Sequence, residues 1–218
     1  MKYLLFDLDG TLTDPGEGIT NAVRYALERF GLRVARREEL YPYIGPPLTD
    51  SFQRYHGLTP EQAQQALAWY REYYADTGIY ENAPYPGIAA FLAGLQREGY
   101  TLLVATSKPE EFAARILQHY GLERYFAFVG GNDLQESRPD KAAVIAHVRR
   151  QYPALTAANA LMIGDREYDV AGAAENGLRT VGVLYGYGSR EELQRAGAAA
   201  VAADLPQLAA VIHRLLPA

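Results

Sequence analysis

Cysteine is absent from the 218-residue chain, which excludes disulfide bonds, thiolate nucleophiles and cysteine-ligated metals and leaves the redox compartment open. Positive charge is not in excess either: the formal net charge is −5, so a broad nucleic-acid-binding surface has little support, although a local basic pocket remains possible. No run of about 20 apolar residues is present, and a strand expected from residue 2 leaves no room for a signal peptide. We therefore expect a cytoplasmic protein whose partners include neither a membrane nor a nucleic acid polymer.

Several catalytic motifs are also missing. The four histidines are scattered without the spacing of a metal site, and the chain has neither a Gly-x-Ser-x-Gly nucleophile elbow nor a Walker phosphate loop. The glycine-rich stretch at 184–193 lacks the Gly-x-Gly-x-x-Gly spacing of a dinucleotide site, and instead predicts a loop followed by a helix capped by Ser189 with Glu192. These absences disfavour a serine hydrolase and a nucleoside triphosphatase.

Short apolar runs are present, each too brief for a helix, and they predict buried strands. These strands are expected at 2–6, 101–105, 126–130, 160–164 and 180–184. Helical patterns alternate with them from about residue 86, at 88–98, 109–120, 141–151, 168–176 and 205–216. Alternating strands and helices predict an α/β protein with a Rossmann-like, doubly wound parallel sheet that carries helices on both faces.

Residues 15–83 interrupt this alternation. They show helical patterns only, at 18–30, 48–56 and 60–75, the last opened by Thr59, Pro60 and Gln62 in a capping arrangement. We therefore expect an α-helical cap domain at 15–83, inserted into an α/β core domain made of 1–14 and 84–218.

Two carboxylates end the first expected strand, in the stretch LLFDLDGTLTD. Asp7 and Asp9 are two residues apart in an extended chain, so both side chains project from the same side. Such a pair persists only beside a cation or with one carboxyl protonated. Gly10 allows a tight turn whose free amides can receive an anion. A magnesium ion between carboxylates and a phosphate satisfies both requirements.

Further polar residues end the later strands, and the fold should gather them at the same sheet edge. Thr106 and Ser107 follow the second strand and offer hydroxyls for a phosphate, while Arg138 and Lys141 precede a helix. Asp165 and Asp169 follow the fourth strand and make a second pair of carboxylates that could face a metal.

The set FDLDGTLTD, VATS, a downstream lysine and IGDREYD resembles the four motifs of the haloacid dehalogenase superfamily, whose members are mostly magnesium-dependent phosphatases. The resemblance covers the whole chain, including a helical cap after the first motif. It is strongest to the phosphoglycolate phosphatase branch and to related proteins labelled 5′-nucleotidases. The stretches that carry it are DPGEGI, YIGPPL, SRPDK and LYGYGSREEL.

The resemblance implies a role for each residue. Asp7 would be the nucleophile that forms an aspartyl-phosphate, and Asp9 the general acid and base. The Mg²⁺ ligands would come from Asp7, Asp9, Asp165 and Asp169. The phosphoryl group would be held by Gly10, Thr106, Ser107, Arg138 and Lys141. Lys141 is favoured over Arg138 for the third motif, because a flexible point charge at a helix start can reach the nucleophile.

Three functions stay open on this basis. The first is a Mg²⁺-dependent phosphatase acting on a small phosphorylated metabolite such as phosphoglycolate, a nucleoside monophosphate or a sugar phosphate. The second is a capped phosphomutase of the β-phosphoglucomutase type, and the third is a non-enzymatic binding or regulatory module on the same fold. The sequence sets neither the substrate nor the oligomeric state.

Overall fold

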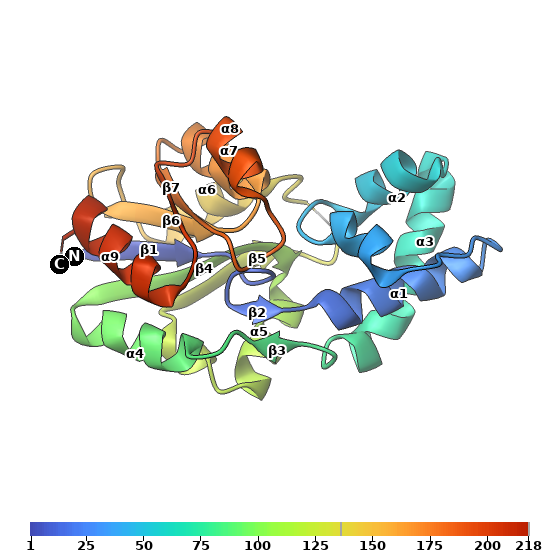
Figure 1. Ribbon diagram of the computed structural model, residues 1–218, viewed down its shortest axis with the longest axis horizontal. Coiled ribbons are helices and arrows are strands. Elements are labelled where there is room, and N and C mark those ends of the chain that lie inside the picture. Colours follow the sequence, from blue (N-terminus) through green and yellow to red (C-terminus); the bar gives the residue numbers. More distant parts are fainter. Residues whose placement is uncertain (136, 218) are drawn as a thin grey trace. The chain divides into compact units, whose positions relative to one another are not determined.

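The computed structural model describes residues 1–135 and 137–217, so Ala218, the end of the expected core domain, lies outside the described residues. Within them, six parallel strands form one sheet in the order β5-β4-β1-β6-β7-β8 (Figure 1). The strands are β1 Lys2–Phe6, β4 Tyr100–Pro109, β5 Phe128–Asn132, β6 Ala160–Gly164, β7 Arg179–Val183 and β8 Ala200–Ala202. In the centre of the sheet, Phe6 of β1 lies opposite Val104 of β4 and Ile163 of β6. The predicted α/β fold class is confirmed.

Helices cover both faces of this sheet, as Figure 1 shows, with α6, α7 and α8 on one face and α4, α5 and α9 on the other. Their bounds are α4 Ile88–Arg97, α5 Glu110–His119, α6 Lys141–Gln151, α7 Glu167–Glu175, α8 Arg190–Arg195 and α9 Leu205–Leu215, with a short 3₁₀ turn at Glu123–Tyr125. Val144 and Val148 of α6 pack with Leu5 of β1 and Leu103 of β4 in the core. The strands therefore have apolar cover on both sides, which is why they appear in the sequence as continuous apolar runs.

The described residues fall into two compact units, one of Met1–Thr13 with Pro84–Ala218 and one of Asp14–Ala83. The second unit is helical, with α1 Gly16–Glu28, a 3₁₀ helix Arg37–Tyr43, α2 Leu48–His56, α3 Pro60–Tyr73 and a π-helical turn Tyr74–Gly78. Its interior is aromatic: the rings of Tyr43 and Phe52 lie 5.2 Å apart, and those of Tyr70 and Tyr74 stack at 5.2 Å. Where the chain passes between the units, β2 Thr13–Asp14 and β3 Ala83–Pro84 form a two-stranded sheet.

Helix starts follow the capping chemistry of the sequence. Thr59 and Gln62 form the reciprocal capping box at the start of α3, and the Ser189 hydroxyl accepts the backbone N–H of Glu192 at 3.1 Å to open α8. The Glu192 carboxylate, which was expected to share in this cap, pairs with the Arg166 guanidinium at 2.8 Å.

Some element boundaries differ from the sequence prediction. β4 continues to Pro109, with its register to β5 shifted between Ala105 and Pro109, so its carboxyl end extends beyond the apolar run. The edge strand β8 was not predicted, because an alanine-rich segment shows no alternation of apolar and polar residues. The 3₁₀ helix Arg37–Tyr43 was also missed, since Pro42 lies inside it and argues against a helix.

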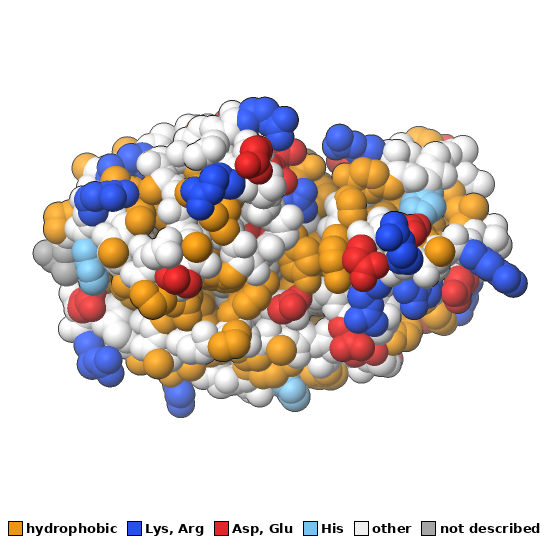
Figure 2. Space-filling view, viewed as in Figure 1, with side chains coloured by type: hydrophobic (Ala, Val, Ile, Leu, Met, Phe, Trp, Pro, Cys, Tyr) orange, Lys and Arg blue, Asp and Glu red, His pale blue; other side chains and the backbone are white. Residues whose placement is uncertain are grey.

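The charges on the surface and the lengths of the helices agree with the similar numbers of acidic and basic residues and with the lack of long apolar runs in the sequence. On the face drawn in Figure 2, acidic and basic side chains are intermixed. Among the described residues, none of the helices combines the length and hydropathy that a membrane span needs.

Candidate active site

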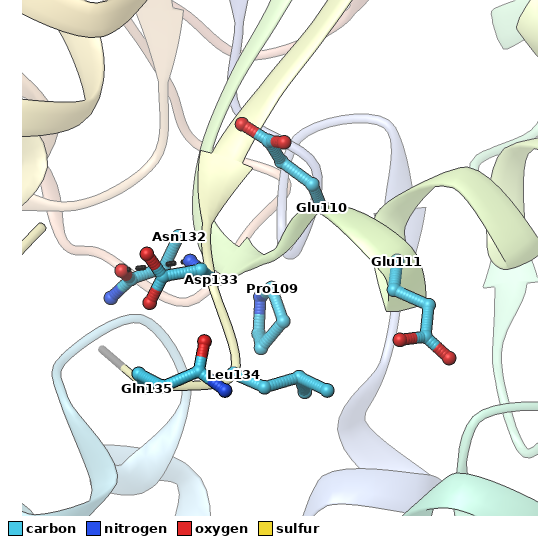
Figure 3. A pocket seen from close by; sticks show the side chains of 7 residues that line it. All are labelled: Pro109, Glu110, Glu111, Asn132, Asp133, Leu134 and Gln135. Carbon is cyan, nitrogen blue, oxygen red and sulfur yellow. Dashed lines mark hydrogen bonds between the residues drawn. The ribbon is translucent and has the colours of Figure 1, made fainter. Parts of the chain in front are cut away.

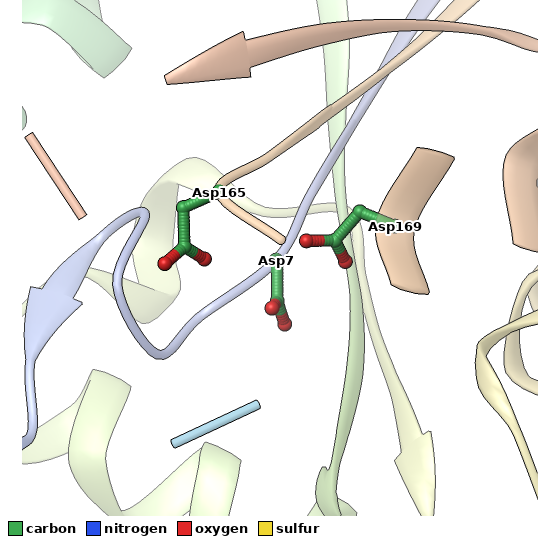
Figure 4. A group of neighbouring side chains, drawn as sticks. All are labelled: Asp7, Asp165 and Asp169. Atoms are coloured by element: carbon green, nitrogen blue, oxygen red, sulfur yellow. The ribbon is translucent and has the colours of Figure 1, made fainter. Parts of the chain in front are cut away.

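Three buried aspartates from separate parts of the described chain converge where β1 and β6 end (Figure 4). Asp7 follows β1, Asp165 follows β6, and Asp169 lies in the first turn of α7. One carboxylate oxygen of each lies within 4.8 Å of the others. Because β1 and β6 are neighbours in the sheet, the ends of both strands deliver their side chains to one place.

Asp165 is fixed by close backbone contacts. Its Oδ2 accepts the backbone N–H of Tyr187 at 2.8 Å, and its Oδ1 accepts the Thr11 hydroxyl at 3.4 Å. Gly10 has a φ of 79°, and a Cβ at this residue would lie 2.2 Å from Asp165 Oδ2. A Cβ on Gly186 would lie 2.3 Å from the Gly10 carbonyl oxygen. Glycine is therefore required at both positions for the two loops to enclose this carboxylate.

Lys141 joins two of the three aspartates. It is the first residue of α6, whose N-terminus is capped by the Asp140 side chain. Its ammonium nitrogen lies 2.9 Å from Oδ1 of Asp7 and 2.9 Å from Oδ1 of Asp169, and it donates to the Ala105 carbonyl at 3.1 Å. Three acceptors therefore match the three N–H bonds of the ammonium group.

The pKa values in this cluster show a shortage of positive charge. Burial raises the pKa of Asp169 to about 6, although Lys141 opposes the shift. Burial, with the charges of Asp169 and Asp7 nearby, raises the pKa of Asp165 well above its ordinary value. The pKa of Lys141 is also raised, because the attraction of Asp169 and Asp7 exceeds the cost of burying the ammonium group.

Asp9 lies beside a lysine that the sequence analysis did not select. Its Oδ2 is 3.0 Å from Nζ of Lys108, and both side chains are largely buried. Burial raises the pKa of Asp9, while the positive charge of Lys108 opposes that shift. The alternation of side chains in a strand could have pointed to this residue. Lys108 lies two residues after Thr106 in β4, so both side chains project from the same face of the strand.

Thr106 and Ser107 lie near the carboxyl end of β4. Thr106 is buried, and its hydroxyl oxygen accepts the backbone N–H of Lys108 at 3.2 Å, while Ser107 is half-buried. The Thr106 hydroxyl keeps its own proton to donate to a phosphoryl oxygen.

Arg138 lies in a separate group of charges. Its guanidinium donates to the Gly131 carbonyl at 2.8 Å and pairs with Glu110 at 3.4 Å, and His147 contacts the same Glu110 carboxylate at 3.2 Å. Glu110 also lines a hollow of about 270 Å³, and Figure 3 draws the side chains around it. The hollow is lined by Pro109, Glu110, Glu111, Asn132, Asp133, Leu134 and Gln135. The structure thus places Arg138 with Glu110 and not with the three aspartates.

The donor set fits a divalent cation. The buried carboxylates belong to Asp7, Asp9, Asp165 and Asp169, and the neighbouring ammonium groups to Lys108 and Lys141. Two ammonium groups face four carboxyl groups, so ionisation of the carboxyls leaves an excess of negative charge that a divalent cation would offset. The carboxylate oxygens are hard ligands of the kind that Mg²⁺ prefers.

The family follows from comparison with known proteins. Residues 4–183 match the model of the haloacid dehalogenase-like hydrolases. The chain belongs to that family. This haloacid dehalogenase-like hydrolase is 43% identical over 210 residues to a 5′-nucleotidase of Pseudomonas aeruginosa, an alignment that covers 96% of this chain and 95% of the relative. It is also similar to the crystal structure of "a predicted phosphatase from Clostridium acetobutylicum", with a TM-score of 0.95, 43% identity and coverage of 98% and 99% of the two chains.

One similar protein is named as a kinase and not as a phosphatase. This haloacid dehalogenase-like hydrolase is 39% identical over 194 residues to the tyrosine-protein kinase PtkA of Mycobacterium tuberculosis, a match over 89% of this chain that spans 66% of that protein's length. The comparisons confirm the predicted family and its class of enzyme, a hydrolase with phosphatases among its relatives.

Proposed function

We propose that this hydrolase is a Mg²⁺-dependent phosphatase that cleaves small phosphomonoesters through an aspartyl-phosphate on Asp7. The observation that supports this most is the way Asp7 is held. Its Oδ1 accepts the backbone N–H of Leu8 at 2.8 Å and lies 2.9 Å from the Lys141 ammonium nitrogen. Both fixed contacts are made to the same oxygen, which leaves Oδ2 as the oxygen that attacks phosphorus.

The first step transfers the phosphoryl group to the enzyme. An electron pair of Asp7 Oδ2 forms the new bond to phosphorus, and the ester P–O bond breaks with its electrons leaving on the alcohol oxygen. Asp9 gives its proton to that oxygen and becomes a carboxylate, a role that its raised pKa supports. Thr106 and the amides around it donate to the phosphoryl oxygens, and Lys141 offsets their charge.

The second step returns the enzyme to its starting state. The Asp9 carboxylate takes a proton from a water molecule as the water oxygen bonds to phosphorus. The bond between phosphorus and Asp7 then breaks, which releases inorganic phosphate and restores the Asp7 carboxylate. One residue therefore serves as acid in the first step and as base in the second.

Asp7, Asp165 and Asp169 would hold the metal through their carboxylates, and Asp9 through its backbone carbonyl oxygen. When bound, Mg²⁺ supplies positive charge that stabilises the transferring phosphoryl group. Tyr187 and Thr11 orient Asp165 for this purpose, as a hydrogen-bonded outer shell does around metal ligands.

Substrate choice is assigned to the helical insertion in this proposal. The residues at the sheet edge would contact only the phosphate and the metal, so we assign residues 15–83 the role of a cap domain and residues 1–14 with 84–218 that of the core domain. The substrate class is a small phosphorylated metabolite, such as a nucleoside monophosphate or phosphoglycolate. Relatives named as a 5′-nucleotidase and as a phosphoglycolate phosphatase, both from Pseudomonas aeruginosa, support this class. The cytoplasmic location stays a prediction.

The other two functions are separated from this one by the fate of the phosphoryl group. A phosphomutase would return the phosphoryl group to a sugar. The relative named as a tyrosine-protein kinase suggests a further possible acceptor, a tyrosine side chain. Hydrolysis releases inorganic phosphate with no acceptor present. A binding module would release none from any substrate.

The deciding experiment is phosphate release across a panel of phosphorylated metabolites, with MgCl₂ and with EDTA. We expect release only with Mg²⁺, and its loss in Asp7→Asn, a variant of the same shape whose unfolding temperature should not fall. Formation of an isomeric sugar phosphate without free phosphate would favour the mutase. Full activity in Asp7→Asn would remove Asp7 as the nucleophile.

A further inference from the structure

We propose that Lys108 is the positioning residue of the general acid and base, holding the Asp9 carboxylate so that one oxygen is fixed and the other is left for proton transfer. This inference rests on the proposed function, because Asp9 has this role only in the two-step hydrolysis. No motif in the sequence selected Lys108, and its placement comes from the structure.

The two oxygens of Asp9 have different surroundings. Oδ2 lies 3.0 Å from the Lys108 ammonium nitrogen, whereas Oδ1 is buried and has no hydrogen-bond partner among the described residues. A buried carboxylate oxygen without a partner costs free energy, so such atoms are rare in folded proteins. An oxygen that exchanges a proton with substrate or water has to be left without a permanent partner, and Oδ1 meets that requirement.

Lys108 is itself firmly placed. Its side chain is 5% exposed, and its backbone N–H donates to the Thr106 hydroxyl at 3.2 Å, in the part of β4 that extends past the apolar run. A buried lysine loses side-chain entropy and hydration, and the attraction within a buried ion pair often does no more than offset the cost of desolvating its two charges. The free-energy cost of burying Lys108 is explained if the ion pair orients a reacting group, because a small displacement of such a group lowers the reaction rate strongly.

A competing role for Lys108 is direct contact with the transferring phosphoryl group. The two roles predict different kinetics. A residue that acts through the general acid matters most for substrates whose leaving group needs a proton. A residue that binds the phosphoryl group matters equally for every phosphomonoester, because all of them present the same group.

The test compares two substrates of the full-length enzyme with Mg²⁺. Phosphoglycolate releases an alkoxide that requires a proton, and p-nitrophenyl phosphate releases a stable phenolate that does not. The parameter is kcat/KM, because it reports the steps up to formation of the phosphoenzyme and leaves out the later hydrolysis. We expect Lys108→Met to lower kcat/KM for phosphoglycolate about 100-fold, within the range of general acid catalysis, and to lower it far less for p-nitrophenyl phosphate.

Three further variants sharpen the result. Lys108→Met added to Asp9→Asn should cost no further kcat/KM for phosphoglycolate, because the group it positions is already disabled. Lys108→Arg should restore part of the activity, since it keeps the charge. Lys2→Met removes a lysine at the opposite end of β1 and should leave both substrates unchanged.

Equal losses on the two substrates, with additive effects of Lys108→Met and Asp9→Asn, would overturn the inference and assign Lys108 to the phosphoryl group. If Lys108→Met does not fold, Lys108→Gln is measured in its place against the same two outcomes. Absence of phosphate release by the unmodified enzyme from both substrates and from every member of the metabolite panel would overturn the proposed function, and this inference with it. Normal release with no difference between the substrates would overturn this inference alone.

Discussion

The ammonium nitrogen of Lys141 lies 2.9 Å from Oδ1 of Asp7 and, at the same time, 2.9 Å from Oδ1 of Asp169. All three side chains are almost completely buried. One cation therefore neutralises carboxylates from two different elements, the end of β1 and the first turn of α7. Removal of this cation would leave both carboxylates buried without it, which is a costly state.

Lys141→Met is accordingly expected to lower both stability and activity. Loss of one partner from a buried ion pair costs about 3–5 kcal/mol, so urea unfolding in EDTA should show a decrease of that order. Phosphate release should fall to near background. Arg138→Met is the comparison variant, because the Arg138 guanidinium pairs with Glu110, and it should cost much less activity. A larger loss in Arg138→Met than in Lys141→Met would reverse our assignment of the third-motif role.

Asp9→Asn is expected to separate the two chemical steps. The amide cannot take a proton from water, so phosphoenzyme should form slowly and then persist. Mass spectrometry of the intact protein after mixing with p-nitrophenyl phosphate and Mg²⁺ would detect the added phosphoryl group. The unmodified enzyme, treated in the same way, should show little of it. Failure to trap phosphoenzyme in Asp9→Asn would count against the role of Asp9 as base.

Stabilisation by Mg²⁺ should depend on pH. The pKa of Asp169 is raised to about 6 and that of Asp165 is raised well above its ordinary value. Because both pKa values are raised, the protonated carboxyls favour the folded state when no metal is bound. The contribution of Asp169 to stability is present below about pH 4 and is lost as the pH rises through about 6, and Asp165 acts in the same direction. Mg²⁺ binds the deprotonated carboxylates, so it should restore stability mainly above that range.

Thermal unfolding with MgCl₂ or EDTA at pH 5.0 and pH 7.5 (roughly one unit or more either side of the Asp169 pKa) tests this expectation. The increase in unfolding temperature caused by Mg²⁺ should be small at the lower pH and clearly larger at the higher one. Asp165→Asn removes one ligand and serves as the control, with a reduced increase at both. An equal increase at the two pH values in the unmodified protein would contradict the linkage.

Gly186→Ala should weaken metal binding without touching a reacting group. A Cβ at Gly186 would lie 2.3 Å from the Gly10 carbonyl oxygen and 2.5 Å from Cβ of Asp165. The loop must move away, and the hydrogen bond from the Tyr187 N–H to Asp165 moves with it. Isothermal titration with MgCl₂ should show an affinity about 10-fold lower, in the range seen when an outer-shell contact is lost. Gly94→Ala controls for the general effect of replacing a glycine, because Gly94, like Gly186, is not at positive φ, and the nearest atom to an added Cβ there is Arg97 Nη2 at 3.9 Å.

The fold class and family could be predicted from sequence because the evidence for both is local. The buried strands 2–6 and 160–164 are continuous apolar runs, and the structure has them at the same residues. The carboxyl ends of parallel strands lie at one sheet edge, so the proximity of Asp7 and Asp165 followed from topology alone.

Other features depend on tertiary contacts and could not be predicted. The extension of β4 to Pro109 carries Lys108 to Asp9, and no sequence pattern reports such a pairing between distant segments. Arg138 was assigned to the phosphate from its place beside the third motif. Its observed partner Glu110 lies in α5, distant in the sequence, so local sequence gave no sign of that contact.

The insertion of residues 14–83 lies between two strands that are themselves neighbours, β1 and β4, and it contributes nothing to the six-stranded sheet. The chain leaves and re-enters the sheet-containing unit at β2 and β3, which pair with each other. Evolution can therefore lengthen, shorten or exchange this segment without altering the strand order or the carboxylates at the sheet edge. Under the proposed assignment of substrate choice to this insertion, selectivity and catalytic chemistry are free to diverge at different rates within one lineage.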